Sequence, residues 1–428
     1  MKKNERLMEQ LGEVDDKFID EAAPETKKKK NPVKFAVIGT MAAAAAGVVL
    51  WQSVKNIPDR KPDKIVADEE KSYSERIEFP ENTGELPVIH TQNGETGGMG
   101  FEGFWAYDVS ELLDGNPSRE NCKFTELPVF IEPSNEIYSH GDFPVYTMDE
   151  MEERLKDIAG LLTDEEFTPV DRHPNGEYYK AEAGDISLSM TCYGRIGIEF
   201  GTAVDLPDEY GVYRMKGKEQ AIKSLDYLGE KYRDIIQMDN PTPSLFTDYD
   251  IYGNSNTTYR LFDNSDDLLT ALMNYNFRDV YFCEEEIQID DPDKHDNPYD
   301  AYEYTGDLTS IYLNDDFSYE EFAGMYPVIS YDEAYDKLIG GDYYTTVWEE
   351  EYLPDGINTD EIFFTGISYK RTADYKYTLP YYRFLVELHA ERTDENALSE
   401  GLKEYGAFYI PAVSPDYLVI ENEDVAFN

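Results

Sequence analysis

Cysteine is rare in this 428-residue sequence, which holds only Cys122, Cys192 and Cys283. An odd and low number excludes the disulfide framework of a small secreted fold. We expect three separate buried thiols, and a single disulfide bridge is the alternative.

The signature motifs of common enzymes are also missing. The sequence contains no His-Glu-x-x-His, no Gly-x-Ser-x-Gly and no P-loop, which removes three large enzyme classes. The histidines have no second ligand at the spacing of a zinc site, and we expect them at the surface or in loops: His90, His140, His173, His295 and His389. We therefore assign no catalytic, cofactor-binding or metal-binding residue and expect no cofactor.

Positive charge is scarce, with 38 Lys and Arg against 89 Asp and Glu and a net charge of −51. Residues 1–64 hold 13 basic and 10 acidic residues, which leaves 25 basic against 79 acidic residues beyond them. Such a surface repels phosphate, so nucleic acid is excluded as a partner of this part. The 35 tyrosines distinguish it from a disordered acidic tail, because they supply core material.

Dense acidic runs at 290–300 and 314–316 raise the question of calcium. These loops either bind calcium weakly through several carboxylates or form a solvated acidic surface. Asp248, Asp250 and Gly253 match the start of an EF-hand loop, but Tyr259 stands where its Glu is required. The EF-hand pattern therefore fails.

A long apolar run is present near the N-terminus, at residues 35–51, and uncharged residues extend it to 54. This length predicts a transmembrane helix, the membrane anchor, formed by Phe35, Val37, Ile38, Val48, Val49, Leu50 and Trp51. Lysines at 27–30 and 34 favour a cytoplasmic N-terminus, with the long C-terminal part outside the cell. A cleaved signal peptide ending near 44–46 is the competing interpretation.

The cytoplasmic stub before this run carries an apolar helical stripe, spaced +4, +3 and +4: Leu7, Leu11, Val14 and Phe18. The opposite face is acidic, so anionic lipid is a poor partner. The stripe predicts a helix that either only solubilises the stub or docks a cytoplasmic protein.

An internal repeat relates residues 144–155 to residues 327–338, with five of twelve positions identical. Each copy predicts a helix that begins with a capping box, Thr147 with Glu150 and Ser330 with Glu333. The buried faces are expected at Met151, Leu155, Ile158, Ala159 and Leu162 in the first helix and at Ala334 and Leu338 in the second. Three strands follow each helix, which predicts either two related helix-plus-meander units or two copies of one helix-start signal.

The remaining pattern predicts an α+β fold with antiparallel sheets and few helices. We expect a helix at 218–236, a hairpin at 247–263 turning at 254–256, a short helix capped by Asn264 or Ser265, and strands at 280–290 and 308–314. Gly98, Gly100 and Gly103 mimic a dinucleotide fingerprint, but a strand rather than a helix follows them.

The predicted organisation has five parts. They are a cytoplasmic stub at 1–32, a transmembrane helix at 33–54, an extracytoplasmic spacer at 55–86, and α+β units at 87–245 and 246–428.

Several stretches occur together in one known group of proteins. They are VDDKFIDEAAP, GMGFEGFWAYDVSEL, ELPVF, YPVIS, PYYRFLVEL and YGAFYIPAV. The chain thereby resembles a family of uncharacterised, single-pass, membrane-anchored proteins of Gram-positive bacteria, and this resemblance implies no catalytic residue. In layout alone it is similar to anti-sigma factors and to membrane-anchored regulators of cell-wall sensor kinases.

The leading functional hypothesis is a non-enzymatic regulatory or sensory protein of the cell membrane, which binds a ligand outside the cell. One alternative is a cell-surface hydrolase that uses carboxylates on wall glycans. Another is a structural surface protein whose tyrosines contact polysaccharide.

Overall fold

The structure is a computed structural model of the whole chain. It describes residues 73, 76–82, 84–92, 102–120, 122–131, 146–207, 209–211, 217–275, 278–286, 302–314, 321–372, 374, 376–390, 392 and 397–421. The chain divides between Ile57 and Pro58, and all described residues belong to the second part. The predicted docking stripe (Leu7, Leu11, Val14 and Phe18) and the predicted span at 35–54 lie outside the described residues. Among the residues that are described, no helix has the length and apolar character needed to cross a bilayer.

An eight-stranded antiparallel sheet forms one half of the fold. In spatial order its strands are β4 (Phe167–Arg172), β5 (Tyr178–Ala183), β6 (Ile186–Thr191), β7 (Ile196–Val204), β11 (Tyr302–Leu313), β10 (Arg278–Glu286), β9 (Ser255–Asp263) and β8 (Pro241–Tyr249). Buried and exposed residues alternate along β5, as expected for a sheet with one covered face. The predicted meander of β5, β6 and β7 is confirmed, and β4 is an additional edge strand.

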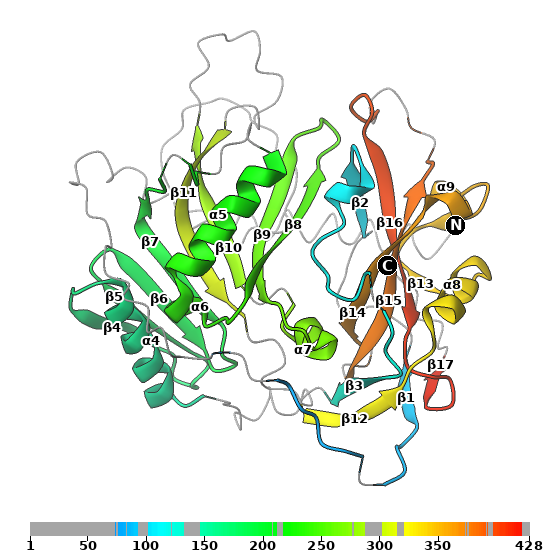
Figure 1. The fold of residues 1–428 in the computed structure, drawn as a ribbon, viewed down its shortest axis with the longest axis horizontal. Helices are drawn as coiled ribbons and strands as arrows, with labels where there is room; N and C mark the ends of the chain where they lie inside the picture. Colours follow the sequence, from blue (N-terminus) through cyan, green and yellow to red (C-terminus); the bar gives the residue numbers. More distant parts are fainter. Residues whose placement is uncertain are drawn as a thin grey trace, which may run out of the picture. The chain divides into compact units, whose positions relative to one another are not determined.

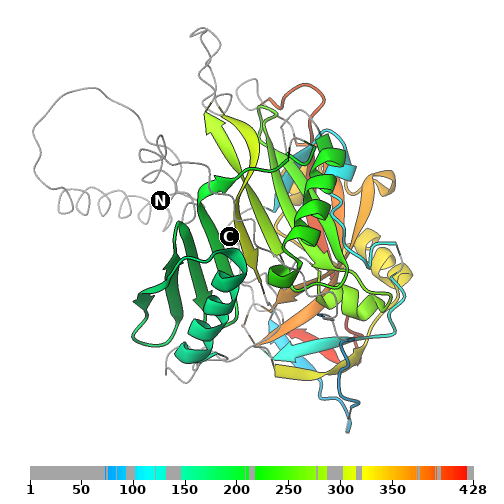
Figure 2. The same cartoon turned by 60° about the vertical axis from the view of Figure 1, so that its left-hand side comes forward.

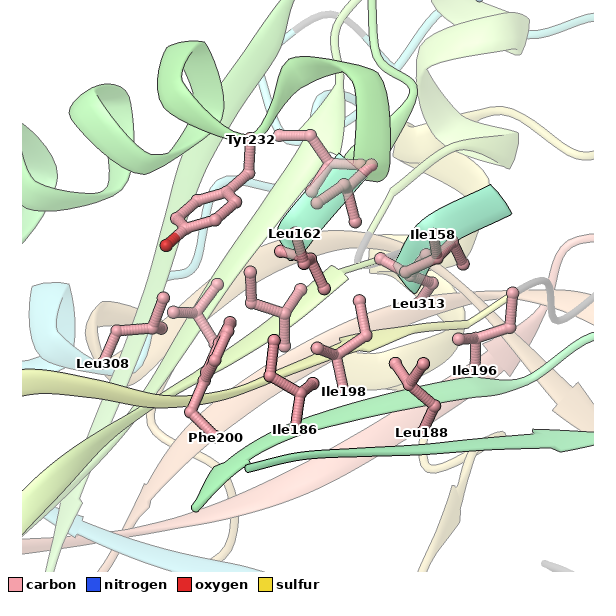
Figure 3. Packing of buried hydrophobic residues seen from close by; sticks show 14 of the residues in the cluster. Ile158, Leu162, Ile186, Leu188, Ile196, Ile198, Phe200, Tyr232, Leu308 and Leu313 are labelled. Carbon is pink, nitrogen blue, oxygen red and sulfur yellow. The ribbon is translucent and has the colours of Figure 1, made fainter. Parts of the chain in front are cut away.

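Helices cover the buried face of this sheet. They are α4 (Met148–Leu162), α5 (Gly217–Lys231) and α6 (Arg233–Ile236). Figure 2 shows α4 against the strands β4–β7, and α5 contacts β8 and β9. In Figure 3, Ile158 and Leu162 of α4 and Tyr232, which joins α5 to α6, point toward the apolar side chains of the sheet. All five residues predicted for the buried face of α4 are buried.

A seven-stranded sheet forms the other half. Its strands are β2 (Gly103–Ala106), β3 (Glu126–Ile131), β12 (Glu321–Pro327), β13 (Tyr344–Thr345), β14 (Ile362–Arg371), β15 (Tyr377–Leu388) and β16 (Lys403–Pro411). The consecutive strands β14, β15 and β16 form an antiparallel meander at its centre. The short helices nearby are η2 (Val109–Glu111), α9 (Glu349–Tyr352) and η5 (Thr359–Glu361).

The second predicted helix is α8 (Tyr331–Ile339), which begins at the N-cap Ser330 with the expected capping box to Glu333. Ala334 and Leu338 are buried against one face of the seven-stranded sheet. Both helix starts of the repeat are therefore confirmed, and each helix precedes a three-stranded meander. Whether the two copies are related units stays a prediction.

Three local details differ from the expectations. The β8–β9 hairpin turns between Tyr249 and Ser255, earlier than predicted, because Asp250 accepts bonds from the backbone of Tyr252 and Asn254. The short helix α7 (Leu268–Met273) is capped by Asp267 instead of Asn264 or Ser265. The predicted boundary between residues 245 and 246 falls inside β8, so strands on both sides of it share one sheet.

The two sheets contact one another through their neighbouring strands and through α7. Phe104 of β2 packs edge-on against Phe246 of β8, with 5.2 Å between ring centroids. Leu272 and Met273 of α7 belong to the core of the seven-stranded sheet, although α7 directly follows β9. Figure 1 shows α7 between the two groups of strands.

The segment from Tyr73 to Gln92, here called the strap, is bonded to both halves. Toward the half with the eight-stranded sheet, the Tyr73 amide donates to Asp239 at 2.8 Å. The Ile77 amide donates to Thr270 of α7, the helix that packs against the seven-stranded sheet, at 3.0 Å. Toward the other half, the Asn82 side chain donates to the Met325 carbonyl at 2.9 Å and accepts from its amide at 3.1 Å. The strap ends as β1 (Ile89–Gln92), which pairs in parallel with β17 (Leu418–Glu421).

Candidate functional site

Three side chains with metal-ligand chemistry converge at one end of the β14–β15 pair. Glu361 ends η5 just before β14, Glu387 lies near the end of β15, and His389 follows that strand. The ligand atoms of these three residues all lie within 4.8 Å of one another. We call this group, together with Lys403 of β16, the Glu–His cluster.

The strand register explains why these residues meet. Ile362 pairs with Val386, so Glu361 and Glu387 stand beside each other one step further along the two strands. Glu387 and His389 are two residues apart, which places both side chains on the same face of the sheet. On the other side of β15, Glu387 pairs with Tyr405 of β16.

Hydrogen bonds and an ion pair hold the Glu–His cluster. His389 Nε2 lies 2.7 Å from Glu361 Oε2, and the His389 amide donates to the Tyr352 carbonyl at 2.9 Å. Lys403 Nζ donates to Glu387 Oε2 at 2.8 Å. The side chain of Glu387 is 13% exposed, against 25% for Glu361 and 52% for His389, so the cluster is open to solvent on the histidine side.

The electrostatics of the Glu–His cluster are dominated by carboxylates. The hydrogen bond to Glu387 raises the pKa of Lys403, and the charges of Glu387, Glu361 and Asp108 act in the same direction. Burial raises the pKa of Tyr405, and four surrounding carboxylates raise it further, those of Glu387, Asp108, Glu111 and Glu361. The site is therefore suited to positive charge.

A second charged group lies on the same face of the seven-stranded sheet, around Arg383. The guanidinium lies 3.5 Å from Glu102 Oε1 and donates to the Tyr409 hydroxyl at 3.1 Å, and Tyr409 donates to Glu102 at 2.6 Å. Burial alone lowers the pKa of Arg383, but Tyr409, Glu102 and Asp114 raise it above its ordinary value. Because these polar atoms pair with one another, the group serves the packing of the sheet.

Sequence reasoning did not single out the Glu–His cluster. The signal that could have found part of it is Glu387-x-His389 at the end of a predicted strand, since that spacing shares a face. Glu361 could not be added, because its position beside Glu387 depends on the β14–β15 register.

The other sequence-based candidates are placed as follows. Cys122, Cys192 and Cys283 form no disulfide, as predicted, but only Cys192 is fully buried. His90 is exposed on β1, His173 lies beside Glu177 in a turn, and His140 and His295 lie outside the described residues. The acidic run at 290–300 also lies outside them. Asp250 caps the hairpin turn with its carboxylate, in agreement with the failed EF-hand pattern.

In comparison with known proteins, no family model matches the chain and no curated protein matches it.

Proposed function

We propose that this chain is a single-pass membrane protein of the cell surface with a sensory or regulatory role. Its acidic α+β part lies outside the cell and binds a ligand there, and its stub docks a cytoplasmic protein. The protein acts by binding rather than by catalysis. Residues 33–54 form the membrane anchor, and the N-terminus lies in the cytoplasm.

The observation that carries this proposal is the way in which the chain enters the fold. The first described residue after the apolar run, Tyr73, donates its amide to Asp239 and its hydroxyl to Asp234. Further along the strap, Asn82 bonds to both backbone groups of Met325. The strap is thus bonded to both halves of the fold, which is what a module needs if a change in either half is to reach the membrane segment.

The topology is tested with protease added to intact protoplasts of cells that express the full chain. We expect digestion of residues 58–428 and survival of an epitope placed at residue 1, because the membrane protects the stub. Recovery of a soluble protein that begins near residue 47 from the medium would show a cleaved signal peptide. In that case both the anchor and the docking role of the stub would be wrong.

The docking role is tested with the full chain as bait in detergent extracts. We expect capture of a cytosolic protein that Leu7→Asp or Leu11→Asp abolishes, because both residues lie on the apolar stripe of the stub. Glu9→Gln, on the polar face, is the matched control and should leave capture unchanged. Equal capture by all variants would rule out docking through the stripe.

A second candidate function is a carboxylate-based hydrolase that acts on wall glycans. One observation favours it, the approach of the Glu361 and Glu387 carboxylates in the Glu–His cluster. Retaining glycosidases use two carboxyl groups about 5 Å apart. Release of reducing ends from purified cell wall, lost in Glu361→Gln and Glu387→Gln, would support it, and the absence of turnover by the intact chain would remove it.

A further inference from the structure

We propose that Glu361, Glu387 and His389 form a binding site for a divalent transition-metal ion, with Zn²⁺ as the probe. Two carboxylates and one imidazole are a ligand set of zinc and related metals. Calcium and magnesium prefer oxygen ligands alone, so the imidazole favours a transition metal over them. The proposal goes beyond the function proposed above and does not depend on it.

The strand register places two like charges side by side. Glu361, which directly precedes β14, lies beside Glu387 of β15, because Ile362 pairs with Val386. Like charges directly opposite each other on paired strands destabilise a sheet. A cation held between the two carboxylates replaces this repulsion with attraction to the cation. Metal binding therefore explains why two like charges lie side by side here.

The local charge balance also calls for a divalent cation. Three carboxylates, Glu361, Glu387 and Asp108, act on the single ammonium group of Lys403. Carboxylates therefore outnumber ammonium groups at the cluster, and a divalent cation reduces this excess of negative charge. Tyr405, which pairs with Glu387 on the neighbouring strand, is 1% exposed, so a buried ring lies beside the cluster.

The existing contacts of the cluster indicate which atoms would bind the metal. The ion pair with Lys403 uses Glu387 Oε2, and so Oε1 is the atom for the metal. A bound metal replaces the hydrogen bond between His389 Nε2 and Glu361 Oε2, which holds both groups near their ligand positions. Two of the ligands lie at the ends of regular elements, which fixes the site more precisely than mobile loops do.

The test is a Zn²⁺ titration of the purified full-length chain in detergent, followed by calorimetry, with Co²⁺ absorbance as a second readout. We expect saturation at a single zinc ion per chain at this site. Glu361→Gln, Glu387→Gln and His389→Ala should each weaken binding at least about tenfold. His389→Ala should also change the visible spectrum of bound Co²⁺, because a nitrogen ligand is lost.

The chain offers a matched control in the half-buried His173, whose Nδ1 lies 3.5 Å from Glu177 Oε2. His173→Ala should bind zinc as the original chain does. Lys403→Met should bind zinc more tightly, because it removes the cation that competes for Glu387. Thermal unfolding of each metal-free variant shows whether it is folded. If His389→Ala does not fold, the near-isosteric variant Glu361→Gln still tests the site.

Three results would overturn the proposal. They are no zinc binding by the intact chain, zinc binding that survives in the triple variant Glu361→Gln/Glu387→Gln/His389→Ala, and calcium binding at the cluster without zinc binding. Because the titration does not involve the stub or the membrane, failure here leaves the docking experiment unaffected.

Discussion

At the scale of single residues, the two capping boxes show how local chemistry defines where a helix begins. Thr147 Oγ1 accepts from the Glu150 amide at 3.3 Å, and the Thr147 amide donates to Glu150 Oε2 at 2.7 Å. Ser330 and Glu333 repeat this arrangement at 3.2 and 2.8 Å. All partners lie within three residues, which is why the sequence predicts both helix starts correctly.

Thr147→Ala should lower the free energy of unfolding by about 1 kcal/mol, because it leaves a helix N-terminal amide without its side-chain acceptor. The hydrogen bonds from Thr147 lower the pKa of Glu150 from its ordinary value of 4.5. The stabilisation by the Glu150 carboxylate is therefore present above pH 4.5 and lost as the pH falls through its folded pKa. We measure the free energy of unfolding by urea titration at pH 7 and pH 3. The difference in this free energy between Thr147→Ala and the original chain should be smaller at pH 3.

Thr168→Ala, at an exposed position of the edge strand β4, is the control for this measurement. It should change the unfolding free energy by less than about 0.5 kcal/mol. An equal loss of stability for the two threonine variants would contradict the role of the cap.

Cys122 should resist alkylation in the folded protein. Burial raises the pKa of its thiol to about 12, with the hydrogen bond to Tyr382 acting in the opposite direction. At pH 8 almost no reactive thiolate forms in the native state, whereas unfolding returns the pKa to its ordinary value of 9.0. Mass spectrometry after iodoacetamide treatment should find Cys122 unmodified in buffer and modified in urea, and rapid native modification would contradict this expectation.

At the scale of elements, β14 shows how an irregular strand is completed by a segment far away in the sequence. A bulge lies between Phe364 and Gly366. Next to it, the Ile367 amide donates to Ser118 Oγ at 2.6 Å, and Asn116 Nδ2 donates to the Ile367 carbonyl at 2.8 Å. The side chains of the 116–118 segment thus replace a neighbouring strand at this position.

Gly366→Ala should destabilise the protein strongly, by about 2 kcal/mol or more, because two effects add. Gly366 has a φ of +121°, which residues with a Cβ rarely adopt, and an added Cβ would lie 2.4 Å from Asn116 Cγ. Thermal unfolding measures the loss. Gly160→Ala is the control, since a Cβ there meets nothing within 4 Å and the position is helical. A harmless Gly366→Ala would mean that Asn116 moves aside.

The elements themselves could largely be predicted from the sequence, but their partners could not. Capping boxes and apolar periodicity indicated the helices α4 and α8, and the alternation of apolar and polar residues indicated the strands of the two meanders. These signals are local in the sequence. In the pairing of β3 with β12, Val129 lies opposite Gly324. Nothing in the sequence of either strand indicates that the other is its partner. For the same reason the Glu–His cluster was missed, since Glu361 and His389 meet only through strand register.

At the scale of the molecule, the strap is the part of the chain that ties the two sheets to the N-terminal region. The described residues up to 86 were predicted as part of an extracytoplasmic spacer, but Tyr73 and Asn82 are bonded to the fold. Ile89, which begins β1, is 1% exposed and belongs to the same hydrophobic core cluster as Tyr326. Removing the strap therefore removes both hydrogen bonds and buried apolar surface.

A chain that begins at residue 93 should be less stable than one that begins at Pro58 by several kcal/mol, because each lost hydrogen bond costs about 1 kcal/mol and the burial of Ile89 about 2 kcal/mol. Thermal and urea unfolding of the two fragments measure the difference.

The point variant Asn82→Ala tests one contact of the strap. It should lower the free energy of unfolding by about 1 to 2 kcal/mol, since it removes both bonds to Met325. The exposed neighbour Glu81 supplies the control Glu81→Ala, which should be close to neutral. Equal stability of the two fragments would show that the strap lies on the fold without supporting it. The proposed link between residues 33–54 and the two halves of the fold would then lose its physical basis.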